Sequence, residues 1–182
     1  MSKCLDQDFP CQDPDYLDFD QIASVELRSP PTVHEIINES AFCTSLPVDE
    51  AVQLGDLTYK DFLRGLKGRT GIYHLWLDYD ECDDHGMHTM LCVYVGKGLA
   101  EARITSHIKT TWPRSQQLYV SFFECSNRLA KYLEQLFLDT YEFHLNKIEN
   151  RGEKHLFGVW DYERHLLGTE LHAVCGLFSD SE

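Results

Sequence analysis

Two tyrosines in short glycine-containing stretches are the first residues of this sequence that could take part in chemistry. Tyr73 ends the triplet Gly-Ile-Tyr at 71–73, and Tyr94 begins the triplet Tyr-Val-Gly at 94–96. Each triplet lies in an aromatic and aliphatic stretch, which predicts two neighbouring strands that present both phenols at one sheet surface. A free phenol has a pKa of about 10, so a nearby cation must lower it before either side chain acts as a base at neutral pH. An ordinary structural strand tyrosine is the alternative for both.

Basic side chains follow the second triplet. Lys97 lies between Gly96 and Gly98, and two glycines allow a phosphate to approach the lysine and the backbone closely. Arg103 and His107 are four positions apart, so on a helix they share one face. The Arg103 guanidinium can contact a scissile phosphate, and His107 can act as a donor or proton shuttle. A solvated polar helix face is the alternative for this pair.

Among the acidic side chains of the longest predicted helix, from Ser126 to about Leu145, Glu134 is the candidate for chemistry. Three of its neighbours on the helix, Ala130, Phe137 and Leu138, are apolar, and a carboxylate at the margin of a buried stripe is costly unless something satisfies it. One divalent cation would do so, because Mg²⁺ is usually held by one or two carboxylates with waters and phosphate. A pairing with Lys131 or another basic residue is the alternative. Asn146 either supports this region or caps the helix.

In this order, these residues resemble the motifs of the GIY-YIG nucleases. The two triplets are similar to the elements that name the family, with Val95 in place of an isoleucine. The stretch 94–107 resembles the family's strand, glycine turn and arginine helix, and 130–134 resembles its metal-binding glutamate helix. The resemblance covers 70–146, under half of the chain. The Gly-Lys-Gly turn also resembles the branch of animal LEM-domain and ankyrin-repeat nucleases, although this sequence contains no ankyrin repeats.

The resemblance implies a metal-dependent endonuclease that hydrolyses phosphodiester bonds in nucleic acid, with DNA as the expected substrate. It implies that Tyr73 or Tyr94 helps to activate water, that Arg103 stabilises the phosphate with help from His107, and that Glu134 holds one Mg²⁺ or Mn²⁺. Three further residues are expected to bind substrate: Gly96, Lys97 and Asn146.

The segment 78–89 departs from the family pattern. Tyr73 and Tyr94 are 21 positions apart, about twice the usual separation, so this segment resembles an insertion and is expected to be a long acidic hairpin loop. It contains five acids, which would repel DNA unless the loop points away from the site. Cys82, His85 and His88, with Cys92 nearby, suggest zinc. Their spacing matches no common structural site, so a solvated hairpin is favoured.

Negative charge is concentrated near the N-terminus. The formal net charge is -14, and residues 1–57 contain twelve acids and two basic residues, while 58–182 contain eighteen acids and fourteen basic residues. We therefore expect an acidic N-terminal extension over 1–57, partly disordered or packed on the domain, and a nuclease-like domain with a C-terminal tail over 58–182. The extension could recruit a protein partner to a catalytically inactive module of this fold. It could also inhibit the nuclease by occupying its own cleft.

The order of elements predicts an α/β (α+β) layer structure with a small three-stranded, mainly antiparallel sheet flanked by helices. The absence of an apolar spanning run, a signal sequence or a paired Cys-x-x-Cys predicts a soluble intracellular protein, cytoplasmic or nuclear, with reduced thiols. Strands are expected at 71–79, 90–95 and 118–125, and helices at 33–42, 58–66, 99–109 and 126–145. Apolar residues of the tail are expected to pack onto the domain: Trp160, Tyr162, Leu166 and Leu167.

Overall fold

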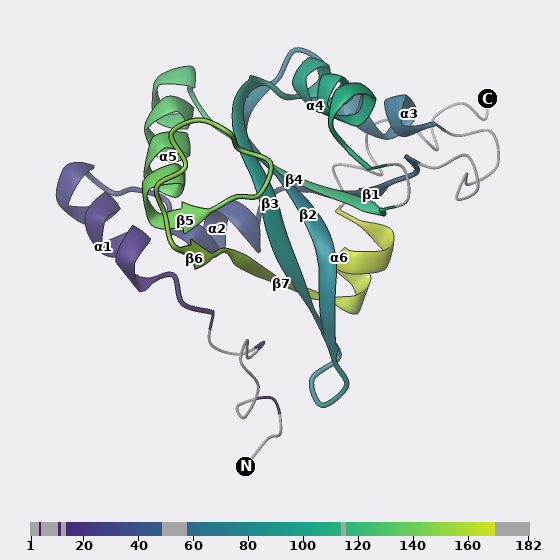
Figure 1. Cartoon of the computed structure of the whole chain (residues 1–182), viewed down its shortest axis with the longest axis horizontal. Coiled ribbons are helices and arrows are strands. Elements are labelled where there is room, and N and C mark those ends of the chain that lie inside the picture. The colour runs from purple at the N-terminus through teal and green to yellow at the C-terminus, as the bar shows by residue number, and fades with distance from the viewer. Residues whose placement is uncertain (1–3, 5–10, 12–13, 49–57, 114–115, 170–182) are drawn as a thin grey trace.

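A curled five-stranded antiparallel sheet forms the centre of the protein, with strand order β1-β4-β2-β3-β7 (Figure 1). The computed structural model describes residues 4, 11, 14–48, 58–113 and 116–169. The strands are β1 (Phe42–Leu46), β2 (Thr70–Cys82), β3 (Met87–Leu99), β4 (Leu118–Glu124) and β7 (Phe157–Asp161). Two short strands, β5 (Tyr141–Glu142) and β6 (Lys154–His155), form a separate parallel pair.

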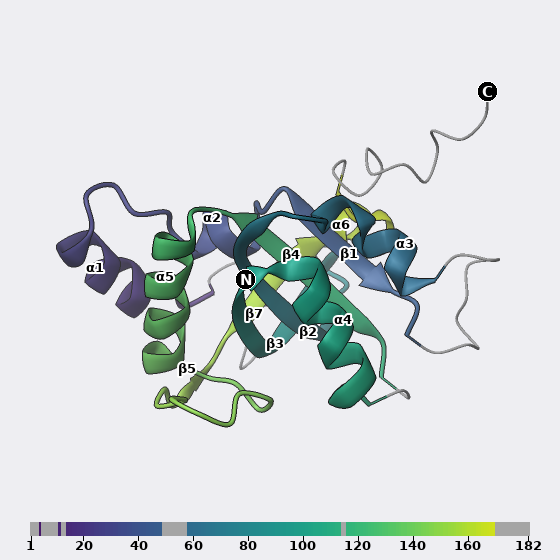
Figure 2. The ribbon, with the colours of Figure 1, turned by 90° about the horizontal axis from the view of Figure 1, so that it is seen from above.

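Helices cover both faces of this sheet. Figure 2 shows α1, α2 and α5 grouped on one side of the β2–β3 hairpin, and α3 and α4 on the other. Residues 71–76 of β2 are all buried because each face of the strand meets a hydrophobic core. The helices are α1 (Leu17–Glu26), α2 (Val33–Ile37), α3 (Tyr59–Leu63) continued by the 3-10 turn η3 (Arg64–Leu66), α4 (Ala100–Thr110), α5 (Asn127–Thr140) and α6 (Tyr162–Leu167). No helix among the described residues is long and apolar enough to cross a bilayer.

The prediction of three strands is wrong, because the sheet has two further strands at its edges. The three predicted strands are β2, β3 and β4, which lie in the middle. β1 pairs with β4 from Phe42 opposite Phe122, and β7 pairs with β3 from Met87 opposite Asp161. Both edge strands are only five residues long and pair with partners far along the chain. Local sequence pattern carries little information on such pairings.

The acidic segment predicted as a loop is mostly strand. β2 and β3 pair as far as Cys82 opposite Met87, with register shifts near Leu75 and Asp78 that increase the local twist. The remaining turn is tight: the amides of His85 and Gly86 both donate to the Cys82 carbonyl oxygen. Figure 1 shows this hairpin extending beyond the rest of the sheet, away from α4 and α5. The acidic side chains of the hairpin therefore lie far from the end of the sheet at which α4 and α5 begin.

Residues 14–48 pack against the sheet and α5. Phe19 of α1 and Ile36 of α2 are fully buried in the same core as Phe137 of α5. Thr32 and Glu35 form a capping box that begins α2, and the chain then continues into β1 instead of extending this helix to residue 42. The boundary expected near residue 57 lies outside the described residues.

Two other expectations need correction. The helix predicted to reach Leu145 ends at Thr140, where Tyr141 adopts an extended backbone and begins β5. In the tail, Trp160 is fully buried as expected, but the apolar side chains of α6 do not pack onto the domain. This helix is only six residues long and turns its apolar residues outward: Tyr162, Leu166 and Leu167 are all more than half exposed.

Candidate active site

Four elements bring the predicted site residues to one end of the sheet. β2 carries Tyr73, β3 carries Tyr94, α4 carries Arg103 and His107, and α5 carries Glu134. Figure 1 shows α4 and α5 on either side of the upper part of β3, which separates the two helices. Each helix begins shortly after a strand, so the strand ends and the first turns of the helices lie close together.

The two phenols and the imidazole form one aromatic group on the α4 face. The Tyr73 and Tyr94 rings are stacked with centroids 6.0 Å apart, and the His107 ring lies 4.1 Å from the ring of Tyr94. Gly96 makes this possible, because a Cβ at that position would lie 2.5 Å from the Tyr73 hydroxyl. Gly96 therefore makes room for the Tyr73 phenol, a different task from the expected contact with substrate.

Burial is the main influence on the ionisation of this group. It raises the pKa of Tyr73, and the neighbouring Tyr94 raises it further. Burial also raises the pKa of Tyr94, whereas Tyr73 acts as a hydrogen-bonding neighbour that lowers it, although the two hydroxyls do not meet in a well-formed hydrogen bond. The pKa of His107 is lowered by burial and by Arg103, so its imidazole is neutral at pH 7. The neutral imidazole is therefore a better proton acceptor than either of the two phenols.

Arg103 projects to solvent next to the glycine turn. Its Nε lies 3.4 Å from the position of a Cβ on Gly98, which has a φ of 104°. A side chain on Gly98 would be strained and would crowd the guanidinium. The turn thus leaves the guanidinium accessible beside the aromatic group, where it influences the pKa of Tyr73, Tyr94 and His107.

Glu134 is paired with Lys97, on the side of β3 that faces α5. Lys97 Nζ lies 2.7 Å from Glu134 Oε2, and both side chains are mostly buried, with exposed fractions of 28% and 20%. The carboxylate also acts electrostatically on Tyr73 and Tyr94 across the strand. The counter-charge of Glu134 is therefore a basic side chain, as the alternative to a metal site expects, although the residue is Lys97 and not Lys131.

A pocket of about 350 Å³ opens around this ion pair. Its basic residues Arg128 and Lys131 precede Glu134 at intervals of three on α5, so they share its helical face. The sequence pattern was not used to select Arg128, and Lys131 was expected only as a possible partner of Glu134, although this spacing was a usable signal. The lining residues are Lys97, Arg128, Lys131, Tyr132, Glu134, Gln135 and Glu149. Three cations against two carboxylates suit a phosphate group.

Glu134 offers a single carboxylate as a possible ligand for a hard cation. In the described part of the chain, Glu134 belongs to no group of three potential metal ligands. A single, partly exposed carboxylate beside a roomy pocket nevertheless fits Mg²⁺, which keeps several waters and binds substrate phosphate. Lys97 competes for the same carboxylate, so cation binding at Glu134 requires this ion pair to open.

Asn146 supports the edge of β3. Its side-chain oxygen accepts from the Val95 amide at 3.0 Å, and its side-chain nitrogen donates to the Val95 carbonyl oxygen at 2.9 Å. The amide thus takes the place of a neighbouring strand between Tyr94 and Gly96. Both of its polar atoms are used in this way, so Asn146 positions the strand.

Comparison of the chain with protein-family models, with curated proteins and with solved structures found no match. The resemblance to the GIY-YIG nucleases therefore depends on the motif residues and on their positions in this fold. Those positions place Tyr73, Tyr94, Arg103 and His107 together on one face of the sheet. Glu134 reaches the same end of the sheet from the other side of β3.

Proposed function

We propose that this protein is a metal-dependent endonuclease of the GIY-YIG type, which hydrolyses phosphodiester bonds in nucleic acid, with DNA as its substrate. One observation carries the proposal: two phenols, a neutral imidazole and an exposed guanidinium lie together at one end of β3. The carboxylate of Glu134, paired with Lys97, reaches the same end from the other side of the strand. These are the groups that phosphodiester hydrolysis needs to accept a proton, stabilise negative charge and hold a cation.

Substrate binding is assigned to cationic side chains. Arg128 and Lys131 line the pocket beside Glu134 and hold phosphates on either side of the scissile bond. The Arg103 guanidinium donates to the oxygens of the scissile phosphate, where negative charge develops during attack. The acidic part of the β2–β3 hairpin extends away from the candidate active site, so it does not repel the nucleic-acid strand that is being cut.

Proton transfer is assigned to the aromatic group. His107 accepts the proton of the attacking water, because its lowered pKa keeps the imidazole neutral at pH 7. Tyr94 is half-buried, and its ring centroid lies 4.1 Å from the His107 ring centroid, so its hydroxyl orients that water. Tyr73 is enclosed beneath Tyr94 and fixes the position of the second phenol.

Glu134 is the residue that would hold Mg²⁺ or Mn²⁺. When bound, the ion supplies Lewis-acid stabilisation of the phosphate charge. Lys97 neutralises Glu134 in the ion pair, which keeps a partly buried carboxylate from being unpaired. Once released from Glu134, the ammonium of Lys97 lies next to the pocket and can donate to a phosphate oxygen.

The test is a cleavage assay with plasmid, branched and single-stranded DNA, with and without added Mg²⁺ or Mn²⁺. We expect cleavage only with the added ion, and a loss of about a hundredfold to a thousandfold in rate for Glu134→Gln. Asp139→Asn is the matched control, since it makes the same change of charge at an exposed position of α5. Equal loss in both variants, or cleavage that survives Glu134→Gln, would contradict the assignment.

A catalytically inactive binding module of the same fold is the second candidate. The Lys97–Glu134 pair favours it, because Glu134 already has a counter-charge and requires no cation for folding. Such a module would bind nucleic acid through the basic pocket residues without cutting it, and its acidic N-terminal segment would recruit a protein partner. Salt-dependent DNA binding without cleavage of any of the three substrates would support this candidate.

A further inference from the structure

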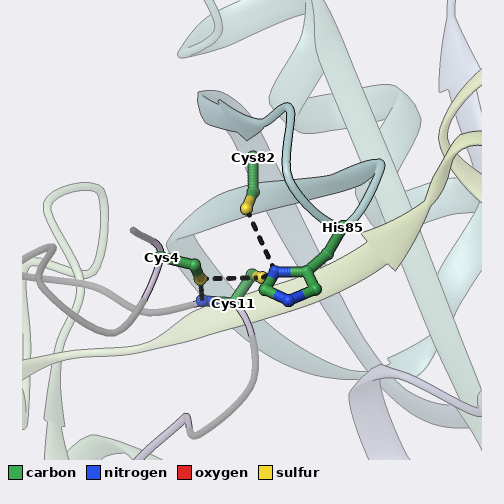
Figure 3. Close-up of side chains that lie close together, drawn as sticks. All are labelled: Cys4, Cys11, Cys82 and His85. Carbon is green, nitrogen blue, oxygen red and sulfur yellow. Dashed lines mark hydrogen bonds between the residues drawn. The ribbon is translucent and has the colours of Figure 1, made fainter. Parts of the chain in front are cut away.

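Three cysteines and a histidine meet at the tip of the β2–β3 hairpin, at the opposite end of these strands from the candidate active site. Cys82 ends β2 and His85 lies in the turn, while Cys4 and Cys11 come from the N-terminal part of the chain (Figure 3). One sulfur or ring nitrogen of each residue lies within 4.8 Å of those of the other three. The three cysteines are buried, and His85 is partly buried.

The distances between these atoms approach those around a tetrahedral zinc ion. Nδ1 of His85 lies 3.4 Å from Sγ of Cys11 and 3.4 Å from Sγ of Cys82. Zinc bonds of about 2.3 Å to sulfur and about 2.0 Å to nitrogen place such atoms roughly 3.5 Å apart at the tetrahedral angle. Sγ of Cys4 and Sγ of Cys11, which are 3.0 Å apart, would have to separate by several tenths of an ångström.

The hairpin turn is shaped to present two of these ligands together. The amides of His85 and Gly86 both donate to the Cys82 carbonyl oxygen, which holds Cys82 and His85 across one tight turn. Gly86 has a φ of 61°, a conformation that glycine adopts without strain. Met87 and Val159 pack against the three cysteines, so the site is enclosed by apolar side chains.

We propose that Cys4, Cys11, Cys82 and His85 bind one structural Zn²⁺ ion, which attaches the N-terminal segment to the tip of the hairpin. Three thiolates and one imidazole are an established ligand set for structural zinc, and four protein ligands leave no position open for a substrate. The thiols lose their protons when the ion binds, and the ion links segments that are more than 70 residues apart in sequence. The site is independent of the nuclease proposal.

A second group near the hairpin does not have this geometry. Asp78, His88 and His165 also lie close together, but the two imidazole rings are stacked with centroids 3.6 Å apart and planes within 4°. Nitrogen lone pairs lie in the plane of each ring, so two parallel rings cannot both be directed at one ion between them. Asp78 Oδ2 already lies 2.9 Å from His165 Nε2. This group is better explained as a hydrogen-bonded histidine stack.

The test is the metal content of the full-length protein, purified without chelators and without added metal. We expect about one zinc per chain by elemental analysis, and its loss in Cys4→Ser, Cys82→Ser and His85→Ala. Cys125→Ser is the matched control, because this cysteine lies after β4 and outside the cluster. Replacement of zinc by Co²⁺ should produce thiolate-to-cobalt charge-transfer absorption and the strong visible bands of a tetrahedral site.

Three results would overturn the proposal. The first is a wild-type chain that has no zinc and acquires no cobalt absorption when titrated with Co²⁺ under reducing conditions. The second is a Cys4–Cys11 disulfide, detected by mass spectrometry after alkylation of the thiols. The third is zinc that persists in Cys4→Ser. This variant keeps the proposal testable if Cys82→Ser does not fold, since Cys4 belongs to neither of the two main hydrophobic cores.

Discussion

The two ends of the β2–β3 hairpin have different chemistry on the same pair of strands. At the base, Tyr73 and Tyr94 lie near a guanidinium and an imidazole, and a pocket of about 350 Å³ opens around the carboxylate of Glu134 on the α5 side of β3. At the tip, Cys82 and His85 close a small apolar site together with cysteines from the N-terminus. An open site with mixed charges suits a substrate that enters and leaves. An enclosed thiol site suits an ion that stays.

This difference also separates function from stability. The proposed roles at the base require groups that change partners, such as the Lys97–Glu134 ion pair, which must open before Glu134 holds a cation. In the proposed zinc site at the tip, all four side chains serve as ligands of the same ion. Perturbation of the base should therefore lower activity with little loss of stability, and perturbation of the tip should do the reverse.

The largest effect is expected from the loss of Arg103. Its guanidinium is exposed and contributes little to packing, so Arg103→Ala should leave the melting temperature nearly unchanged. Cleavage should fall by about a hundredfold to a thousandfold, because the developing phosphate charge loses its rigid donor. Arg103→Lys should recover only part of this, since an ammonium lacks the planar fork. Lys109→Ala, also exposed on α4, is the control, and a similar loss there would contradict the assignment.

A change at the tip should produce the opposite pattern. Cys82→Ser should lower the melting temperature by roughly 5–10 °C as zinc is lost and the N-terminal segment detaches. The cleavage rate at 20 °C, well below the transition, should change less than about threefold, because the site at the base keeps its geometry. Thermal melts and initial rates on the same preparations measure both quantities. A hundredfold loss of rate would show that the two ends are coupled.

Between the two ends, His74 should make stability depend on pH. Burial lowers the pKa of this imidazole from 6.5 to about 3, and neither ring nitrogen has a hydrogen-bond partner among the residues that the structure describes. Below pH 6.5 the unfolded chain binds a proton that the folded chain excludes. Stability should therefore be full above pH 6.5 and fall by up to about 1.4 kcal/mol per pH unit as the pH decreases toward 3.

Urea denaturation between pH 7.5 and pH 5 measures this effect while most carboxylates remain ionised. The comparison with His74→Phe removes contributions from other groups, including the thiols at the tip, because both proteins share them. The free energy of unfolding should depend less steeply on pH in the variant. Parallel pH dependence in the two proteins would show that His74 is protonated in the folded state or that the folded chain admits water to it.

The smallest effect is expected from Lys97→Met. This variant removes the cation that competes for Glu134, so the Mg²⁺ concentration for half-maximal activity should decrease by about three- to fivefold. The maximal rate should also decrease, because the lysine no longer contacts phosphate. Lys131 lines the same pocket without pairing with Glu134. Lys131→Met should therefore weaken DNA binding and leave the Mg²⁺ requirement unchanged. An unchanged Mg²⁺ requirement in Lys97→Met would show that the ion pair does not compete with the cation.

Local sequence patterns are sufficient to predict the central strands, the two helices that carry site residues, and the order of the site residues along the chain. Strands β2, β3 and β4 and helices α4 and α5 follow local patterns of hydrophobicity, glycine and helix caps, which act between neighbours in the chain. Arg103 and His107 could be placed together for the same reason, since helical spacing alone puts residues four apart on one face.

The tertiary structure alone decided which distant segments meet. β1 and β7 complete the sheet, Asn146 binds the edge of β3, and Lys97 rather than Lys131 pairs with Glu134. The cysteine cluster is the clearest case, because Cys82 and His85 alone lack the spacing of a zinc site and become one only when Cys4 and Cys11 arrive from the N-terminus. Such contacts depend on closing long loops and burying shared apolar surface, and no local window of sequence contains both partners.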